Sequence, residues 1–583
     1  ELDTYYSQIK QVDNLVADVN AGLSPALQDF FKGVQQLAGS PASITARQAF
    51  VSSAQSLVSR FQSLDARLSE MYTGVNEQLA STVTLINSYG EQIARLNERI
   101  AVSQAASGQP PNDLLDERDQ VVAELNKQIR VTTALEGDGS LSIFIGSGQQ
   151  LVVGQRASSL DVRPSYADPE RFTVGLVNGT AYQELPETML SGGNLSGFLR
   201  FRNESLDKAV NTLGNVAASL ASVFNAQQGL GQDLLGQTTG TPGFAEKLFL
   251  FESTNVPKII GHALNRGTAT VSAASVTELS GTRGFDAPGV ANGNFSTELT
   301  GSDYEIRFDG AGGYSIKRLS DKATITPTAN ADGSVSFDGL RLNIDAAGGV
   351  EGDRFLLEPT REISRNFRLN SQVTGDPRLV AAASPVRSDT GINTITGLPN
   401  SGNALVSAPT VTQGFDLTVL PVTYTYDAGA NTINGDPYDP AGTTFTVGGV
   451  SFTITGRPND GDTFLVGANT NGVSNSSNAV LMGKLQTQNT MLANPGSGGN
   501  ASFQGVYAQM VSAIGNTTRE VEVTAEAQRT LLEQAEATRN AQSGVNLDEE
   551  AANLLRFQYA YQASAKMLEV GTRLFDTVLS IGR

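Results

Sequence analysis

Apolar residues recur with helical spacing from the first residues of the chain. They follow alternating three- and four-residue steps, which is the a/d seam of a coiled coil. The seam consists of Leu2, Tyr5, Ile9, Val12, Val16, Val19 and Leu23. We therefore expect a helix that reaches a turn around 22–25. Because no capping residue precedes the pattern, we expect the chain to begin inside a longer helix whose N-terminal portion is missing.

A longer helical pattern follows over Pro41–Ala106. Ser40 has the residue type of an N-cap, and proline suits the first helical position after it. The a/d spacing holds to Val75 and a new seven-residue series starts at Leu79, an insertion that locally unwinds a supercoil. At about 1.5 Å per residue, the helix would be about 95 Å long. Gly and Pro at 107–111 break it, and a further apolar series predicts an antiparallel helical hairpin.

Helical spacing returns at about residue 478 and continues to the end of the chain. The last helix is expected to begin at about 546, and its apolar residues recur every seven positions. They are Leu547, Leu554, Tyr561, Leu568 and Phe575, and the matching N-terminal series is Leu2, Ile9, Val16 and Leu23. Either these series form the core of a bundle, or they pair with another terminal helix or another copy of the chain. We favour pairing, because a single chain has least to cover its own ends.

Between the helical ends the apolar period changes to two, which is typical of strands, and one helical pattern interrupts it near 195–228. A motif over 337–357 resembles another over 446–466, which indicates two related β modules. The sequence thus predicts a multidomain α plus β fold, in which a long antiparallel helical coiled-coil bundle from both chain ends carries inserted β-rich domains. The expected domains are an N-terminal helical part of the core at 1–135, a first β-rich domain at 136–365, a second, outer one at 366–475, a C-terminal helical part of the core at 476–545 and a terminal coiled-coil helix at 546–583.

Composition narrows the chemistry available to these domains. The 583 residues include no Cys, no Trp and one His, and the net charge is −19. Without Cys the chain has no disulfide, zinc-thiolate site, iron–sulfur cluster or cysteine nucleophile. A strongly acidic surface argues against nucleic-acid binding. No stretch of the sequence reaches the roughly 18 consecutive apolar residues of a membrane span.

Several short segments contain residues with potential chemistry, and each has a plainer interpretation. Asp113 and Asp116 suggest a carboxylate pair or a metal site, but acids also complement the first turn of a helix. His262 as a catalytic base would need a Ser and an acid that the sequence does not locate. The segments 459–462 and 436–439 contain acids without the loop length of a calcium site, so we expect turns there. We predict no catalytic residue, no cofactor and no metal site.

Several motifs resemble a known family. Residues 543–554, Ser-Gly-Val-Asn-Leu-Asp-Glu-Glu-Ala-Ala-Asn-Leu, and 559–566, Tyr-Ala-Tyr-Gln-Ala-Ser-Ala-Lys, are similar to the C-terminal segment shared by bacterial flagellar rod, hook and hook-associated proteins. Further stretches narrow the resemblance to the hook-associated proteins of the hook–filament junction. They are Phe30-Phe31 followed by Pro41 and Ala46-Arg47, residues 112–119, and Gly197–Arg202 with Phe224-Asn225 and Gly231–Leu234. The similarity spans nearly the whole chain and is loosest over about 270–470.

The resemblance implies a structural component of the bacterial flagellum that forms the junction between hook and filament and is required for filament assembly. The implied partners are neighbouring copies in a helical ring, the hook protein, the next hook-associated protein and a cytoplasmic export chaperone that grips the last helix. Nucleic acid and membrane are not among them, and no enzymatic activity is implied. The resemblance also implies export without a cleaved signal peptide, and a helix over 546–583 whose N-terminal partner helix is absent here.

Two other functions remain open from the residues alone. A secreted adhesin or surface-recognition protein would bind its ligand through the β-rich part over 245–470. A glycosidase would depend on carboxylates such as Asp113 and Asp116.

Overall fold

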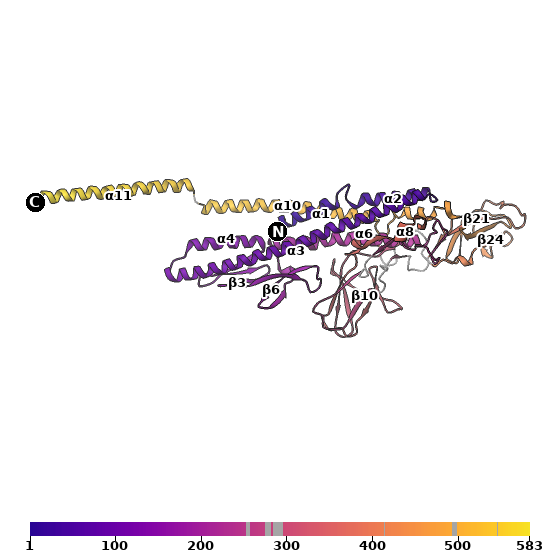
Figure 1. Cartoon of the computed structure of the whole chain (residues 1–583), viewed down its shortest axis with the longest axis horizontal. Helices are drawn as coiled ribbons and strands as arrows, with labels where there is room; N and C mark the ends of the chain where they lie inside the picture. The colour runs from indigo at the N-terminus through magenta and orange to yellow at the C-terminus, as the bar shows by residue number, and fades with distance from the viewer. Residues whose placement is uncertain are drawn as a thin grey trace. The chain divides into compact units, whose positions relative to one another are not determined.

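The computed structural model describes residues 1–251, 257–273, 282–283, 295–412, 414–492, 498–544 and 546–582. The chain divides into two compact units, Glu1–Arg519 and Glu520–Arg583. The first unit combines long helices with β-sheets, and the second is helical (Figure 1). The expected α plus β fold, with β-rich regions inserted between helical ends, is confirmed.

The first helix ends earlier than the heptad pattern predicts. Helix α1 (Leu2–Val16) is followed by a turn, and α2 (Leu23–Gly39) starts at the residue that should have closed the first seam. The Asp18 carboxylate accepts hydrogen bonds from two backbone N–H groups just after it, which stabilises this turn. Val19, expected within the seam, is consequently 81% exposed.

The longest helix, α3 (Ile44–Ser107), agrees with the predicted rod except at its start. Ser43 is the N-cap in place of Ser40, because its side chain accepts a hydrogen bond at 3.3 Å from a backbone N–H in the first turn. After the break the chain returns in α4 (Asn112–Gln128), which packs against α3, so the helical hairpin is confirmed. Buried apolar residues continue through the inserted step of α3: Val75, Leu79, Ile86, Ile93 and Ile100.

Further helices complete the core of the first unit. Helices α5 (Gly193–Phe201) and α6 (Asp207–Gly229) are joined by a π-helical turn over Arg202–Leu206, and both contact α3. Short helix α9 (Ser477–Lys484) contacts α2 and α6. Phenylalanine rings from distant segments meet between these helices, with the centroids of the Phe30 and Phe224 rings 5.0 Å apart in an edge-to-face arrangement. The buried rings are Phe30, Phe31, Phe50, Phe224 and Phe249.

The first β region lies along α3. Its sheets have the orders β1-β2-β3-β4 and β5-β6-β7, and strands β3 to β6 contact the helix. Ile143 and Ile145 are buried, as the period of two predicts. Leu151 and Val152 of β3 are both buried although they are consecutive, and the β2–β3 register shifts between Ile143 and Phe144. The strands are β1 (Val131–Leu135), β2 (Leu141–Ile145), β3 (Gln149–Val153), β4 (Arg156–Ala157), β5 (Ser159–Pro164), β6 (Phe172–Asn178) and β7 (Ala181–Glu184).

We call residues 258–358 the inner β module. Its sheets have the orders β10-β18-β17-β16 and β15-β14-β13-β19-β9. The strands are β9 (Lys258–Gly261), β10 (Thr270–Ala273), β13 (Tyr304–Phe308), β14 (Tyr314–Arg318), β15 (Thr324–Ile325), β16 (Thr328–Ala329), β17 (Val335–Phe337), β18 (Leu340–Asp345) and β19 (Arg354–Glu358), with β11 (Thr282–Arg283) paired to β12 (Ser296–Thr297). The chain then passes through α7 (Ile363–Asn366) to β20 (Phe367–Leu369), which pairs with β8 (Phe249–Phe251).

We call residues 386–468 the outer β module, which follows α8 (Ser371–Gly375). One sheet has the order β21-β29-β24-β25-β26, and in another β28 pairs with β22, β23 and β27. The strands are β21 (Val386–Thr390), β22 (Leu405–Val406), β23 (Thr410–Val411), β24 (Val422–Asp427), β25 (Thr432–Ile433), β26 (Asp436–Pro437), β27 (Thr443–Val447), β28 (Val450–Thr455) and β29 (Thr463–Ala468).

The two β modules share the motif that the sequence repeat indicates. Hairpin β17–β18 turns at Asp338 and Gly339, and hairpin β27–β28 turns at Gly448 and Gly449. All four turn residues have positive φ, between 45° and 76°, as a two-residue hairpin turn with the twist of the strands requires. In each module the next strand, β19 or β29, joins a different sheet.

The C-terminal helices are α10 (Phe503–Ser543) and α11 (Leu547–Ile581). The start of α10 belongs to the first unit, and α11 belongs to the second. Among the residues that the structure describes, no helix combines the length and apolar character needed to cross a membrane.

Candidate functional site

The N-terminal seam is covered by other parts of the first unit. Ile9, Val16 and Leu23 are buried, and Leu2 is half-buried. Helix α1 packs on α5, and the Tyr5 hydroxyl lies 2.9 Å from the hydroxyl of Ser205 in the π-helical turn. Since helices of the same chain cover most of this seam, its buried side chains contribute to the core of the bundle.

The start of α10 closes this seam from the other end of the chain. The Tyr507 hydroxyl donates a hydrogen bond to the Val16 carbonyl at 2.8 Å and accepts one from the Leu23 N–H at 3.2 Å. One buried side chain therefore satisfies backbone groups at the end of α1 and the start of α2. The N- and C-terminal helical parts are thus joined within the first unit.

The apolar seam of α11 is exposed, in contrast to the buried N-terminal seam. All five predicted residues are 67–80% exposed: Leu547, Leu554, Tyr561, Leu568 and Phe575. The exposed apolar surface also includes residues that the seven-residue series missed, namely Leu555, Met567, Leu574 and Ile581. Met567, Leu574 and Ile581 are themselves seven residues apart, so a second series in the sequence would have found them. A single helix with two adjacent apolar rows is typical of packing between more than one neighbour.

The polar groups of α11 stabilise the helix itself. The Asn546 side chain caps its first turn by accepting a hydrogen bond from the Asp548 N–H at 3.1 Å. The Glu569 carboxylate lies 2.7 Å from both the Lys566 ammonium and the Arg573 guanidinium, at i,i+3 and i,i+4 spacing. The helix therefore has local support for its conformation while its apolar rows stay in contact with water.

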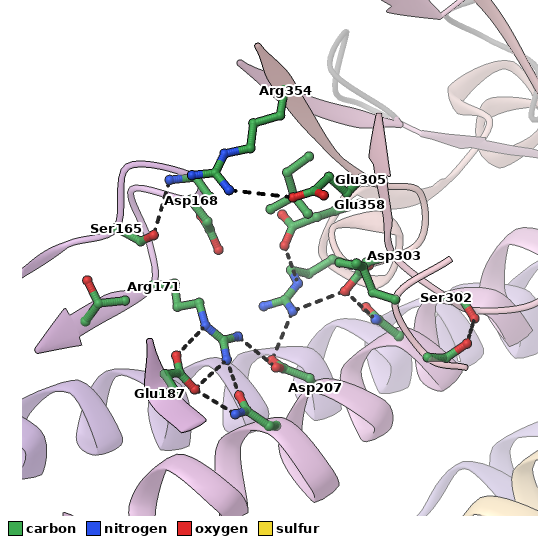
Figure 2. A pocket seen from close by; sticks show the side chains of 18 of the residues that line it. Ser165, Asp168, Arg171, Glu187, Asp207, Ser302, Asp303, Glu305, Arg354 and Glu358 are labelled. Carbon is green, nitrogen blue, oxygen red and sulfur yellow. Dashed lines mark hydrogen bonds and ion pairs between the residues drawn. The ribbon is translucent and has the colours of Figure 1, made fainter. Parts of the chain in front are cut away.

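A second candidate site is a cavity of about 480 Å³ where α6, the sheet β5-β6-β7 and the inner β module meet (Figure 2). The charged side chains in and behind its wall come from elements far apart in the sequence, so no local motif marks them. We call them the joint cluster: Asp168, Arg171, Glu187, Arg202, Asp207, Lys258, Asp303, Glu358, Arg361 and Glu362.

Two acids of the joint cluster have close cationic partners. The Glu187 carboxylate lies 2.7 Å from the Arg202 guanidinium and 3.2 Å from that of Arg171. The Asp207 carboxylate lies 2.9 Å from both Arg171 and Arg361. Burial alone would raise the pKa of each carboxyl, but the guanidinium groups outweigh it and hold the pKa of Glu187 and of Asp207 below the ordinary value. Both acids therefore stay ionised at neutral pH.

Two other acids of the joint cluster are less well compensated. The Arg361 guanidinium also lies 2.9 Å from the Glu358 carboxylate and 3.6 Å from that of Asp303. Together with Asp207, three carboxylates therefore share one guanidinium. The Lys258 ammonium lies 3.5 Å from Glu358 and 3.4 Å from Glu362. Burial raises the pKa of Glu358 to about 7 and also raises the pKa of Asp303, in spite of the nearby Arg361.

The single histidine lies on the rim of the same cavity. His262 is buried, its Nδ1 accepts a hydrogen bond from the Leu264 N–H at 3.2 Å, and its Nε2 lies 2.8 Å from the Arg354 guanidinium. Burial and the Arg354 charge lower the pKa of His262, so the ring is neutral at neutral pH. Its contacts are those of a packed histidine.

The acidic segment of α4 has a structural use other than a carboxylate pair. Asp113 and Asp116 are exposed at the start of the helix. Arg118 of the same segment is buried and donates to the Asn97 side chain at 3.2 Å and to the Gly139 carbonyl at 2.9 Å. It therefore joins α4 to α3 and to the turn between β1 and β2.

Of the two acidic segments of the outer β module, 459–462 forms the expected turn, whereas 436–439 begins with strand β26, which pairs with β25. Their acids accept hydrogen bonds from the protein itself. The Asp462 carboxylate accepts from the N–H groups of Ser401, Gly402 and Asn459 and from the Asn393 amide, at 2.8–3.1 Å. Asp439 accepts from a backbone N–H two residues on. Within the described ranges, no three His, Cys, Asp or Glu side chains are grouped so as to hold a metal ion.

Comparison with protein families finds matches in three parts of the chain. A family model described as the flagellar hook-associated protein FlgK helical domain matches residues 9–244. A model of the D2-like domain of flagellar hook-associated protein 1 matches residues 290–359, and one of the flagellar basal body rod FlgEFG protein C-terminal region matches residues 539–581. The last match coincides with α11.

Similar proteins that match over the whole chain are also flagellar hook-associated proteins. Flagellar hook-associated protein 1 of Salmonella typhimurium is 30% identical over 582 residues, which is all of this chain and 85% of the relative. The protein of that name from Escherichia coli is also 30% identical, over all of this chain and 84% of its own length. The structure of the flagellar hook junction protein FlgK from Burkholderia pseudomallei superposes with a TM-score of 0.78 at 32% identity, covering 94% of this chain and 98% of that one.

Proposed function

Because this chain belongs to the family of flagellar hook-associated protein 1, we propose that it is a structural subunit of the bacterial flagellum that forms the junction between hook and filament and is required for filament assembly. The observation in the molecule that supports this function best is the exposed double apolar row of α11. Burial of a large apolar side chain stabilises an assembly by about 1.5–3 kcal/mol, so a helix of this kind supplies much of the association energy of a packed tube.

The likeness to structural flagellar proteins over the whole chain favours this function over an adhesin or a glycosidase. The acids that a glycosidase reading would use, Asp113 and Asp116, lie exposed at the start of α4. We infer that the protein acts mechanically and not as an enzyme: the helical bundle bears the contacts along the tube, and the β modules shape the exterior of the subunit.

The partners follow from the same proposal. Neighbouring copies would contact one another in a helical ring, with the hook protein on one side and the next hook-associated protein on the other. Before assembly, a cytoplasmic export chaperone would cover Leu554, Tyr561 and Leu568, since an exposed apolar helix fits a hydrophobic groove. The proposed location is the flagellum outside the cell, reached by export without a cleaved signal peptide.

The proposed domain division is supported by the sheet topology. Strands β21 to β29 pair among themselves within 366–475, and most strands of 136–365 pair within that range. Two pairings cross the proposed boundaries, because β2 pairs with β1 and β8 pairs with β20. The helical parts at 1–135 and 476–545 would form the core, with 546–583 as the terminal helix.

The exposed seam of α11 provides the test. Replacing Leu554, Tyr561 and Leu568 together by Ser should abolish filament growth on hooks, because the assembly loses its apolar contacts, and deletion of 546–583 should do the same. The unfolding midpoint of the first unit should not change, because these side chains are exposed. The matched control replaces Lys566 and Arg573, on the polar face of the same helix, by Ala. Filaments of normal number on cells with the seam variant would refute this role of α11.

A further inference from the structure

The inner β module is attached to the helical body by two chain segments that meet at the joint cluster. One enters at Lys258, the first residue of β9, and the other leaves after Glu358, the last residue of β19. These two residues are cross-strand partners, with ammonium and carboxylate 3.5 Å apart. Shortly after β19, Arg361 reaches Asp207 at the start of α6. Charged contacts therefore contribute to the attachment of the module to α6 (Figure 2), beside the neutral hydrogen bonds that Asn215 and Ser219 of α6 make with Leu299 and Thr297.

Carboxylates outnumber cations at this joint. Counting only residues that the structure describes, the joint cluster has six carboxyl and four basic groups, and its ion-paired side chains are at most 21% exposed. From the surrounding elements, Glu170, Glu305, Arg354 and Tyr72 also face the cluster, and Glu184, Lys208 and His262 line the same cavity. Glu170, Glu305 and Arg354 are more exposed, and water screens them. Six largely buried carboxylates against four cations leave two negative charges in a region of lowered dielectric constant, which is unfavourable unless protons are bound.

Two carboxyls of the joint cluster combine a shared cation with an oxygen that accepts no hydrogen bond. Glu187 and Asp207 each have two guanidinium neighbours within 3.2 Å. Glu358 and Asp303 share the guanidinium of Arg361 with Asp207. Each has one carboxylate oxygen, Oε2 and Oδ1 respectively, that accepts no hydrogen bond in the structure, although the Lys258 ammonium lies 3.5 Å from the Glu358 Oε2. A proton bound at such an oxygen removes a buried charge without displacing a hydrogen bond.

We propose that the joint between the inner β module and α6 is a proton-binding site, at which uptake of protons by Glu358 and Asp303 locks the module against the helical body and their loss loosens it. The proposal concerns the folded chain itself and does not rest on the role in the flagellum. The ligand is a proton, and the structural response is the protection of the strands that carry the joint, β9 and β19.

The pH window follows from the direction of the shift. Burial first, with Asp168 and Asp303 nearby, raises the pKa of Glu358 from 4.5 to about 7. A carboxyl that holds its proton more tightly in the folded state stabilises that state fully when protonated, and the stabilisation decreases as pH rises from about 4.5 through 7. The joint should therefore be tightest in mildly acidic solution.

Hydrogen exchange of the full chain tests this directly. After correction for intrinsic exchange chemistry, the protection of amides in β9 and β19 should fall at least about tenfold between pH 6 and pH 8, since one pKa unit corresponds to a tenfold change. In the variant Glu358→Gln, which carries a permanently neutral side chain of the same shape, protection should stay high and its dependence on pH over this range should become much smaller, with the remainder due to Asp303. Asp303→Asn should reduce the slope in the same direction.

The matched control is Glu187→Gln in the same cluster. Because Arg171 and Arg202 compensate the Glu187 charge, this variant should lower protection at both pH values and leave the slope unchanged.

If Glu358→Gln does not fold, infrared spectra of the unaltered chain decide the question, since protonated carboxyl should disappear between pH 6 and pH 8. A flat protection profile in the unaltered chain, an unchanged slope in Glu358→Gln, or no protonated carboxyl at pH 6 would overturn the proposal.

Discussion

At the scale of single residues, Arg47 shows how a buried cation can hold two distant segments together. Its Nε donates to the Pro41 carbonyl at 2.7 Å and its Nη1 to the Val380 carbonyl at 2.6 Å, with the Pro377 and Arg378 carbonyls at 3.4 and 3.3 Å. Burial lowers the pKa of Arg47 to about 10, so the group remains charged at neutral pH. The start of α3 is thereby tied to the chain that leads into the outer β module.

Replacing Arg47 by Met should lower the free energy of unfolding by about 2–4 kcal/mol, because hydrogen bonds from a charged donor contribute about 1.5–3 kcal/mol each. Urea unfolding of the full chain measures the loss. The control is Arg67→Ala on the same helix, where an exposed pair with Glu70 at 3.0 Å contributes less than about 1 kcal/mol. Equal unfolding midpoints for the two variants would contradict this account of Arg47.

At the scale of elements, both β modules fix a loop with an aspartate that follows a glycine of positive φ. Asp353 accepts hydrogen bonds from the N–H groups of Arg266, Gly267 and Val350, as Asp462 does from its own three backbone donors. For Asp353, the bonds from these N–H groups lower the pKa; for Asp462, burial opposes them but they prevail, and its pKa is also lowered. The repeated Gly-Asp therefore has a structural reason.

Asp462→Ala should destabilise the outer β module by about 2–3 kcal/mol, because four donors lose a charged acceptor. The contribution of a carboxylate with a lowered pKa is present above its ordinary value of 3.8 and disappears as pH falls through the folded value. The difference in melting temperature between Asp462→Ala and the unaltered chain should thus be large at pH 7 and small near pH 2. Asp389→Ala, an exposed acid of the same module, is the control. A difference that persists unchanged at low pH would show that charge is not the cause.

The elements that the sequence predicted are those whose signal is local. The long helix α3 repeats its apolar period over 64 residues, and the turn of each β hairpin shows in its glycines. The early end of α1 was missed because a single carboxylate, Asp18, outweighs the continuing heptad. The joint cluster could not be predicted, since Arg171, Asp207 and Glu358 meet only when three separate elements have packed. Exposure of the α11 seam likewise depends on what the rest of the chain covers.

At the scale of the whole molecule, the outer β module leaves and returns to the helical body at one place. The Asn469 N–H donates to the Pro385 carbonyl at 2.9 Å, and Val386 pairs with Ala468 on neighbouring strands. The two ends of the insertion are therefore adjacent. An insertion of this kind adds little strain to the domain that carries it.

Replacing residues 386–468 by a short Gly-Ser link should leave the helical body folded. Its free energy of unfolding should change by less than about 1 kcal/mol, because the link joins ends that are already adjacent. Circular dichroism at the helical band and urea unfolding measure this. If the shortened chain lost the cooperative unfolding of its helices, the outer module would be part of the core and not an insertion.

The two hydrogen bonds of the Tyr507 hydroxyl join parts of the chain that are synthesised at very different times. The groups that it joins at Val16 and Leu23 are made early by the ribosome, and their partner appears 491 and 484 positions later. Contacts between such distant positions form late, because the chain must lose the entropy of a long loop before the contact can form. Helices α1 and α2 therefore cannot complete this contact until Tyr507, 491 and 484 positions further on, has been synthesised. A core that is completed this late leaves the chain easy to unfold during synthesis, which suits the proposed export of the subunit.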